Sequence, residues 1–127
     1  MNRLPILLAT ALTAGAVALG GCSKAEPQLS FAKDVQPLLT SRCGGCHVPD
    51  QPGYEASGLS VESYDALMKG TKFGAIVIPG DPLSSTLTML VEGRADPSIR
   101  MPHGGASLPA AEQKILRDWV AQGAKNN

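Results

Sequence analysis

Residues 43–47 read Cys-Gly-Gly-Cys-His, and they carry the clearest chemistry in the chain. A C-x-x-C-H sequence is the attachment motif for c-type haem. In such a motif the two thiols, here those of Cys43 and Cys46, would form thioether bonds to the haem vinyl groups, and the histidine, here His47, would be an axial ligand of the iron. The two-residue gap places both sulfurs on one side of a helical turn. The sequence therefore predicts one covalently bound haem c per chain.

Two other chemistries use the same residue types. C-x-x-C can be half of a structural zinc site, which needs four ligands, and after the motif only His103 remains as a further His or Cys. C-x-x-C can also be a dithiol oxidoreductase motif, usually in a βαβ context, whereas this chain shows little strand pattern. Both alternatives are weaker than haem attachment, and they stay open at this point.

A six-coordinate haem needs a second axial ligand, usually a methionine sulfur or a histidine nitrogen. Met68 and Met89 fall in predicted helices, where packing explains them. Met101 instead lies in a loop rich in proline and glycine, and Pro102 favours an extended backbone at the residue before it. Met101 is therefore the predicted distal ligand, and His103 in the same loop is the alternative.

The first 21 residues are predicted to be a signal peptide. A positive start at residues 1–3 precedes a mainly apolar, uncharged run over residues 4–19, which is too short to span a membrane. Leu19-Gly20-Gly21-Cys22 resembles the lipobox of bacterial lipoproteins, where cleavage leaves the cysteine first and acylated. By resemblance to lipoprotein sorting signals, Ser23 favours the outer membrane. We therefore expect an exported protein, lipid-anchored and facing the periplasm.

The cysteine count agrees with a lipid anchor. The chain has three cysteines, an odd number for an exported protein. Haem takes Cys43 and Cys46, and acylation takes Cys22, so no free thiol remains. The alternative is ordinary cleavage nearby, with Cys22 left as a spare thiol.

Composition predicts one small domain. We expect residues 22–30 to form a tether and residues 31–127 to form the haem domain. The chain has 11 basic and 11 acidic residues and no basic stripe, so nucleic acid is not an expected partner. Aromatic residues make up only 4% of the chain, so its core gains from a large apolar cofactor.

The pattern of apolar residues predicts an all-α fold of about four helices without a sheet. Phe31, Val35, Leu38 and Leu39 share one helical face that leads into Cys43. We expect this helix to start after a Ser30 cap and to be interrupted near Pro37, and a loop over 48–58 to follow it. Next come a short helix capped by Ser60 and stopped by Gly70, and an extended connector over 71–80. The chain then forms a helix capped by Asp81 and stopped by Gly93, a loop over 93–107 and a last helix over about 109–122.

The chain resembles a class I c-type cytochrome of the bacterial kind with a single haem domain. The resemblance covers residues 31–124 and rests on the motifs at 34–38, 43–47, 58–59, 80–82 with Ser85, 101–102 and 119–124. It implies a small cytochrome c-like fold wrapped around the haem, with Met101 as the distal ligand. It also implies that the first and last helices cross near Phe31, Val35, Ile115 and Trp119.

The chain departs from this family's pattern at one place. Many members carry Gly-Pro-x-Leu after the haem motif, and the proline carbonyl group fixes the proximal imidazole. Here that carbonyl could come from Pro49, Pro52 or Gly58, and it would set the tautomer and basicity of His47. Three further side chains could contact the haem propionates or simply be solvated: Arg94, Arg100 and Tyr54.

The predicted function is one-electron transfer. Two protein ligands leave no open iron position, so we expect no enzyme activity and no small-molecule substrate. The expected partners are redox proteins, met through small and weak contacts, and a membrane reached through the N-terminal lipid. The alternatives are a haem sensor or small peroxidase-like enzyme with a displaceable distal ligand, or an accessory cytochrome subunit of a larger dehydrogenase.

Overall fold

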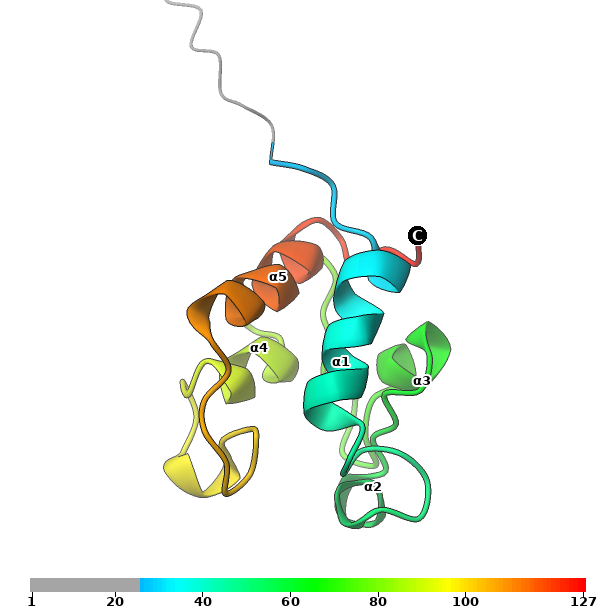
Figure 1. Cartoon of the computed structure of the whole chain (residues 1–127), viewed down its shortest axis with the longest axis vertical. Coiled ribbons are helices and arrows are strands. Elements are labelled where there is room, and N and C mark those ends of the chain that lie inside the picture. The colour runs from blue at the N-terminus through cyan, green and yellow to red at the C-terminus, as the bar shows by residue number, and fades with distance from the viewer. Residues whose placement is uncertain (1–25) are drawn as a thin grey trace, which may run out of the picture.

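A computed structural model describes residues 26–127 of the chain (Figure 1). The predicted signal peptide and Cys22 lie outside these residues. Within them the chain is helical, and its one β-type pairing is an isolated bridge between Thr71 and Gly74. The expected all-α class is thus confirmed for the described residues. The elements are η1 (π-helical, Phe31–Val35), α1 (Gln36–Cys43), α2 (Pro52–Ser57), α3 (Tyr64–Lys69), α4 (Thr86–Val91), η2 (3-10, Pro97–Ile99) and α5 (Ala110–Ala121).

The first helical segment forms as predicted. The Ser30 hydroxyl accepts a hydrogen bond from the Lys33 N–H (3.3 Å), and the Ser30 N–H donates to the Asp34 carboxylate (2.8 Å). These reciprocal bonds satisfy backbone donors that a helix start leaves free. The expected interruption near Pro37 is a change from π-helical to α-helical geometry at Gln36, and the proline lies in the first turn of α1. Because α1 continues directly from η1, whose last bond runs from the Gln36 N–H to the Phe31 carbonyl, Pro37 supplies no N–H to continue that series.

The last helix packs on the first through aromatic rings. The ring centroids of Phe31 and Trp119 lie 5.5 Å apart, and Tyr64 meets Phe31 edge-on at 5.2 Å. The Trp119 indole N–H donates to the Lys125 carbonyl (3.0 Å), and the Tyr64 hydroxyl donates to the Ala124 carbonyl (2.8 Å). The predicted packing of the first and last helices near Phe31 and Trp119 is therefore confirmed.

The middle of the chain differs from expectation at α2 and α3. The segment 48–58, expected to be a loop, contains the short helix α2. α3 is capped by Ser63 rather than Ser60, so the Ser60 cap was wrong, although Gly70 ends the helix as predicted. Ser60 instead accepts a hydrogen bond from the Glu62 N–H (3.3 Å).

The start of α4 was also predicted too early. The Asp81 carboxylate accepts hydrogen bonds from the Leu83 and Ser84 N–H groups (3.1 and 3.0 Å) and closes a turn. α4 begins only after Ser85, whose side chain is buried. The Ser85 hydroxyl donates to the Asp81 carbonyl (2.7 Å) and accepts from the Ile78 N–H (2.8 Å). This turn fixes α4 to the 76–78 segment and so positions the loop that follows α4.

Candidate haem-binding site

The Cys43–His47 motif forms a single turn at the end of α1. The Cys46 and His47 N–H groups both donate to the Cys43 carbonyl, at 3.1 and 2.9 Å. Gly44 makes this turn possible, because a Cβ atom there would lie 2.6 Å from the Thr40 carbonyl oxygen. Both cysteines are free thiols, with Cys46 exposed and Cys43 partly buried. Two thiols and an imidazole thus stand on one short, hydrogen-bonded segment.

Burial distinguishes Cys43 chemically. Burial raises the pKa of the Cys43 thiol to about 11, and the negative charge that Cys46 can carry acts in the same direction. At neutral pH the Cys43 side chain is therefore held as a protonated thiol before any haem is attached.

The His47 imidazole is supported by the α2 segment. The His47 carbonyl accepts from the Val61 N–H (2.9 Å), and the Tyr54 N–H donates to the Cys46 carbonyl (2.9 Å). Gly53 packs so closely that a Cβ atom there would lie 2.9 Å from His47 Cε1. The imidazole is consequently held between the turn and α2.

The unpaired nitrogen of His47 provides a test of fit for haem. His47 Nδ1 is buried and has no hydrogen-bond partner. Burial lowers the pKa of His47, while the nearby Leu59 carbonyl raises it by favouring the protonated ring. A proximal haem ligand needs such an acceptor beside Nδ1. Leu59 directly follows Gly58, and sequence analysis did not single it out, because its approach to His47 depends on the path of the chain around α2.

Met101 lies in the loop after α4. Its N–H donates to the Leu90 carbonyl (3.2 Å), and the side chain is partly buried against the core. The Met101–Pro102 peptide bond is cis. His103, two residues later, is exposed. The structure thus ties Met101, but not His103, to the packed part of the domain.

Arg100 closes the Met101 loop. Its guanidinium donates to the Ser107 hydroxyl (2.7 Å) and to the Gly105 carbonyl (2.8 Å). Arg94 is bonded to the Leu83 and Pro82 carbonyls (2.9 and 3.1 Å). Both arginines, considered above as propionate contacts, are engaged with the chain itself. The partners of Arg100 lie in a Gly-rich loop whose path has no sequence signal.

The two segments that carry the predicted axial ligands share an unusual pattern of burial. No residue of segment 41–58 is buried, and none of segment 92–107 is buried. Figure 1 shows both at the lower end of the molecule, with α2 on one side and the loop after α4 on the other. Segments that remain half exposed on both sides of one end are suited to pack against a large apolar group. The residues present therefore fit a haem held by Cys43, Cys46 and His47.

The alternative chemistries find no support in the described residues. Across residues 26–127, no three His, Cys, Asp or Glu side chains converge as the ligands of a metal ion. The same residues contain no strand on which a βαβ dithiol site could be built.

Comparison with known proteins identifies the same region. Residues 43–105 match the model of a protein family described as Planctomycete cytochrome C (PSCyt1). The match begins at the first cysteine of the motif and includes Met101, and it supports a cytochrome c-type domain. No curated protein and no solved structure gives a significant match to the chain.

Proposed function

We propose that this protein is a one-electron carrier with one haem c bound covalently through Cys43 and Cys46. In this proposal His47 and Met101 are the axial ligands of the iron. The observation that carries it is the turn after α1, where two free thiols and a half-buried imidazole stand on one hydrogen-bonded segment. The family match over residues 43–105 supports the haem-binding, electron-transfer role.

Bound haem supplies an iron that changes between Fe(III) and Fe(II). The residues of this chain do the rest. Cys43 and Cys46 fix the macrocycle, and His47 occupies the proximal position. The Leu59 carbonyl, which raises the pKa of His47, is the candidate acceptor for the ring N–H, and such a bond would set the tautomer of the ring. Met101 would supply the second protein ligand to the haem iron, which would leave no open site for a substrate and would tend to raise the potential.

Covalent attachment is tested on protein made with a cytochrome maturation system. The haem should stay with the polypeptide in acidified acetone, and the reduced and oxidised spectra should be low-spin and unchanged by carbon monoxide. Haem that extracts freely would refute the thioether bonds. Carbon monoxide binding to the wild-type protein would favour the sensor or peroxidase-like alternative instead.

The distal ligand is tested by comparing two neighbouring variants. Met101→Ala should open the sixth position to carbon monoxide and lower the reduction potential. His103→Ala, the matched control in the same loop, should leave both unchanged because His103 is exposed. The reverse result would make His103 the ligand.

We also propose that the protein is exported and anchored to a membrane through acylated Cys22. Among residues 26–127, no helix is long and apolar enough to cross a bilayer. Stable attachment by lipid requires more than one acyl chain, which lipoprotein processing provides. Mass spectrometry of the purified protein should find residue 22 as the diacylated or triacylated N-terminus. An unmodified cysteine, or an N-terminus elsewhere, would refute the anchor.

A further inference from the structure

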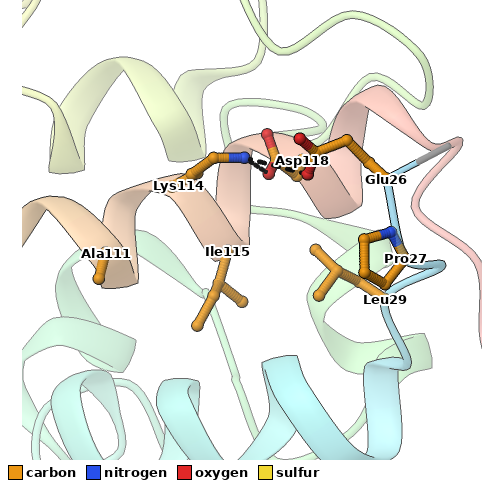
Figure 2. Close-up of a pocket in the computed structure, with 7 residues that line it drawn as sticks. All are labelled: Glu26, Pro27, Leu29, Ala111, Lys114, Ile115 and Asp118. Atoms are coloured by element: carbon orange, nitrogen blue, oxygen red, sulfur yellow. Dashed lines mark hydrogen bonds and ion pairs between the residues drawn. The ribbon is translucent and has the colours of Figure 1, made fainter. Parts of the chain in front are cut away.

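The segment before η1 is fixed along α5. The Gln122 side-chain oxygen accepts hydrogen bonds from the Leu29 N–H (2.8 Å) and the Gln28 amide (2.9 Å), and its amide nitrogen donates to the Pro27 carbonyl (3.1 Å). Lys114 pairs with Glu26 at 3.4 Å. Figure 2 shows Glu26, Pro27 and Leu29 beside Lys114, Ile115 and Asp118 of α5. Residues 26–30 therefore belong to the folded domain.

The last residues close over the same segment. The Asn127 main-chain oxygen accepts from the Ala32 N–H (3.0 Å) and from the Ser30 hydroxyl (2.7 Å), and its side-chain oxygen accepts from the Phe31 N–H (3.0 Å). We refer to residues 26–30 together with residues 122–127 as the terminal clasp. It lies at the upper end of Figure 1, opposite the turn after α1.

Two lengths decide how an anchor at Cys22 would hold this domain. Glu26 lies four positions after Cys22, so even a fully extended chain between them spans only about 14 Å. From Phe31 to Cys43 the helical rise is about 18 Å. The Cys43 end therefore lies farther from the clasp than the anchor can reach. If the tether were free from Cys22 up to Phe31, it would extend roughly 30 Å, and the domain could turn its Cys43 end toward the membrane.

We propose that an anchor at residue 22 holds the terminal clasp against the bilayer surface and turns the Cys43–His47 end toward the aqueous phase. This end then meets a water-soluble redox protein, and it does not meet a carrier dissolved in the lipid. The inference rests on the proposed function for the haem and the anchor, and it adds the orientation and the kind of partner.

Exposed apolar side chains at the far end fit contact with a protein partner. Phe73 is 81% exposed and Ile99 is 52% exposed. Phe73 follows Lys72, whose N–H donates to the Ser57 carbonyl (2.8 Å) at the end of α2. Ile99 precedes Met101 by two residues. A few exposed apolar residues beside a redox group suit a small, transient interface.

The orientation can be measured on haem-loaded protein exported from a signal peptide without a lipobox. Residue 22 is then the one thiol not used by haem, and it can be coupled to a maleimide phospholipid in phosphatidylcholine vesicles. Hydrogen exchange should slow severalfold at residues 26–32 and 122–127 on coupling, and should not change at residues 44–58 and 93–107. Slowing at the latter two segments, or at neither end, would overturn the proposal.

A pair of variants tests whether the clasp sets the orientation. Gln122→Ala with Asn127→Ala removes the side-chain hydrogen bonds of the clasp and leaves the two that the main-chain oxygen of residue 127 accepts, so the slowing on vesicles should weaken at residues 26–32. Gln113→Ala, a control on the same helix whose amide donates to the Leu108 carbonyl (2.8 Å), should keep it. Unchanged slowing in the double variant would overturn the role of the clasp. Because the lipid is coupled chemically, these results stand whether or not cells acylate Cys22, which mass spectrometry tests separately.

Discussion

The two ends of this domain are built by different means. At the clasp end, Val35 and Trp119 are fully buried and Phe31 is 5% exposed. At the Cys43–His47 end, segments 41–58 and 92–107 contain no buried residue. Hydrophobic burial is the main favourable contribution to folding, and every buried apolar side chain of the described residues lies outside these two segments, so the rest of the domain provides most of the stability. In the proposed function, haem would pack against these two exposed segments, so the buried core and the candidate site occupy different parts of the domain.

Removing the largest buried side chain should have the greatest effect. Trp119→Ala deletes a fully buried indole that contacts Phe31 and donates to the Lys125 carbonyl. Phe/Trp→Ala changes in cores cost about 3–5 kcal/mol of unfolding free energy. Urea unfolding followed by circular dichroism should show this loss, while the haem spectrum in the absence of urea stays that of the wild type.

Trp119→Phe keeps an aromatic ring at the same place and serves as the control if Trp119→Ala does not fold. It should lose less stability, because the ring contacts are kept and the indole hydrogen bond is removed. A change in haem ligation in either variant, at unchanged secondary structure, would contradict the separation between the two ends.

The second prediction concerns Cys43 before haem attachment. With a pKa of about 11, against an ordinary value of 9.0, its thiolate fraction near pH 8 falls roughly a hundredfold. In apo-protein carrying Cys46→Ser the smaller contribution, from Cys46, is removed and burial remains, so alkylation of Cys43 should still be clearly slower than in urea and should keep rising with pH above 9. Equal alkylation rates in the folded and unfolded states would show that the Cys43 thiol is exposed to solvent in the folded protein.

The raised pKa of Cys43 also makes the stability of the apo-protein depend on pH. Because folding raises the pKa of this thiol, its contribution to stability is present below pH 9 and is lost as pH rises toward 11. Apo-protein with Cys46→Ser should unfold at lower urea concentrations across that range. Cys43→Ser on the same background should remove this pH dependence.

Features with a local signal were predictable, and features set by distant contacts were not. Ser30 and Gly70 were identified correctly, because a cap acts within its own turn. The Ser60 cap was wrong because its hydroxyl accepts from the Glu62 N–H (3.3 Å), and the helix begins only after Ser63, whose hydroxyl accepts from the Ala66 N–H (3.2 Å). The Asp81 cap was wrong because the Ser85 hydroxyl accepts a hydrogen bond from the Ile78 N–H, and α4 begins only after Ser85.

The same rule applies to the candidate site. The Cys43–His47 turn is local, and its chemistry could be inferred from five residues. The Leu59 carbonyl reaches His47 only because the chain folds around α2, and Arg100 closes the Met101 loop across several glycine-rich positions. Neither has a periodic or spaced signal in the sequence.

A smaller effect is expected where one hydrogen bond joins the middle of the chain to the clasp end. Tyr64→Phe removes the bond from the hydroxyl to the Ala124 carbonyl (2.8 Å) and keeps the ring contacts with Phe31. A hydrogen bond of this kind contributes about 1 kcal/mol. Thermal unfolding should show this loss, and a loss as large as that for Trp119→Ala would mean that the aromatic cluster had repacked.

The smallest effect on global stability is expected at Arg100, on the other end. Arg100→Ala removes two bonds, to Ser107 and Gly105, in a segment without buried residues, so the unfolding free energy should change by less than about 1 kcal/mol. The local effect should be larger, because these bonds close the loop that carries Met101. Exchange of the Met101 amide should quicken severalfold, and the haem-loaded variant should admit carbon monoxide faster than wild type. Lys114→Ala, which breaks exposed ion pairs with Glu26 and Asp118 far from this loop, should change neither. If both variants behave alike, the Met101 loop is held by its bond to Leu90 and by the iron, and Arg100 is only a surface group.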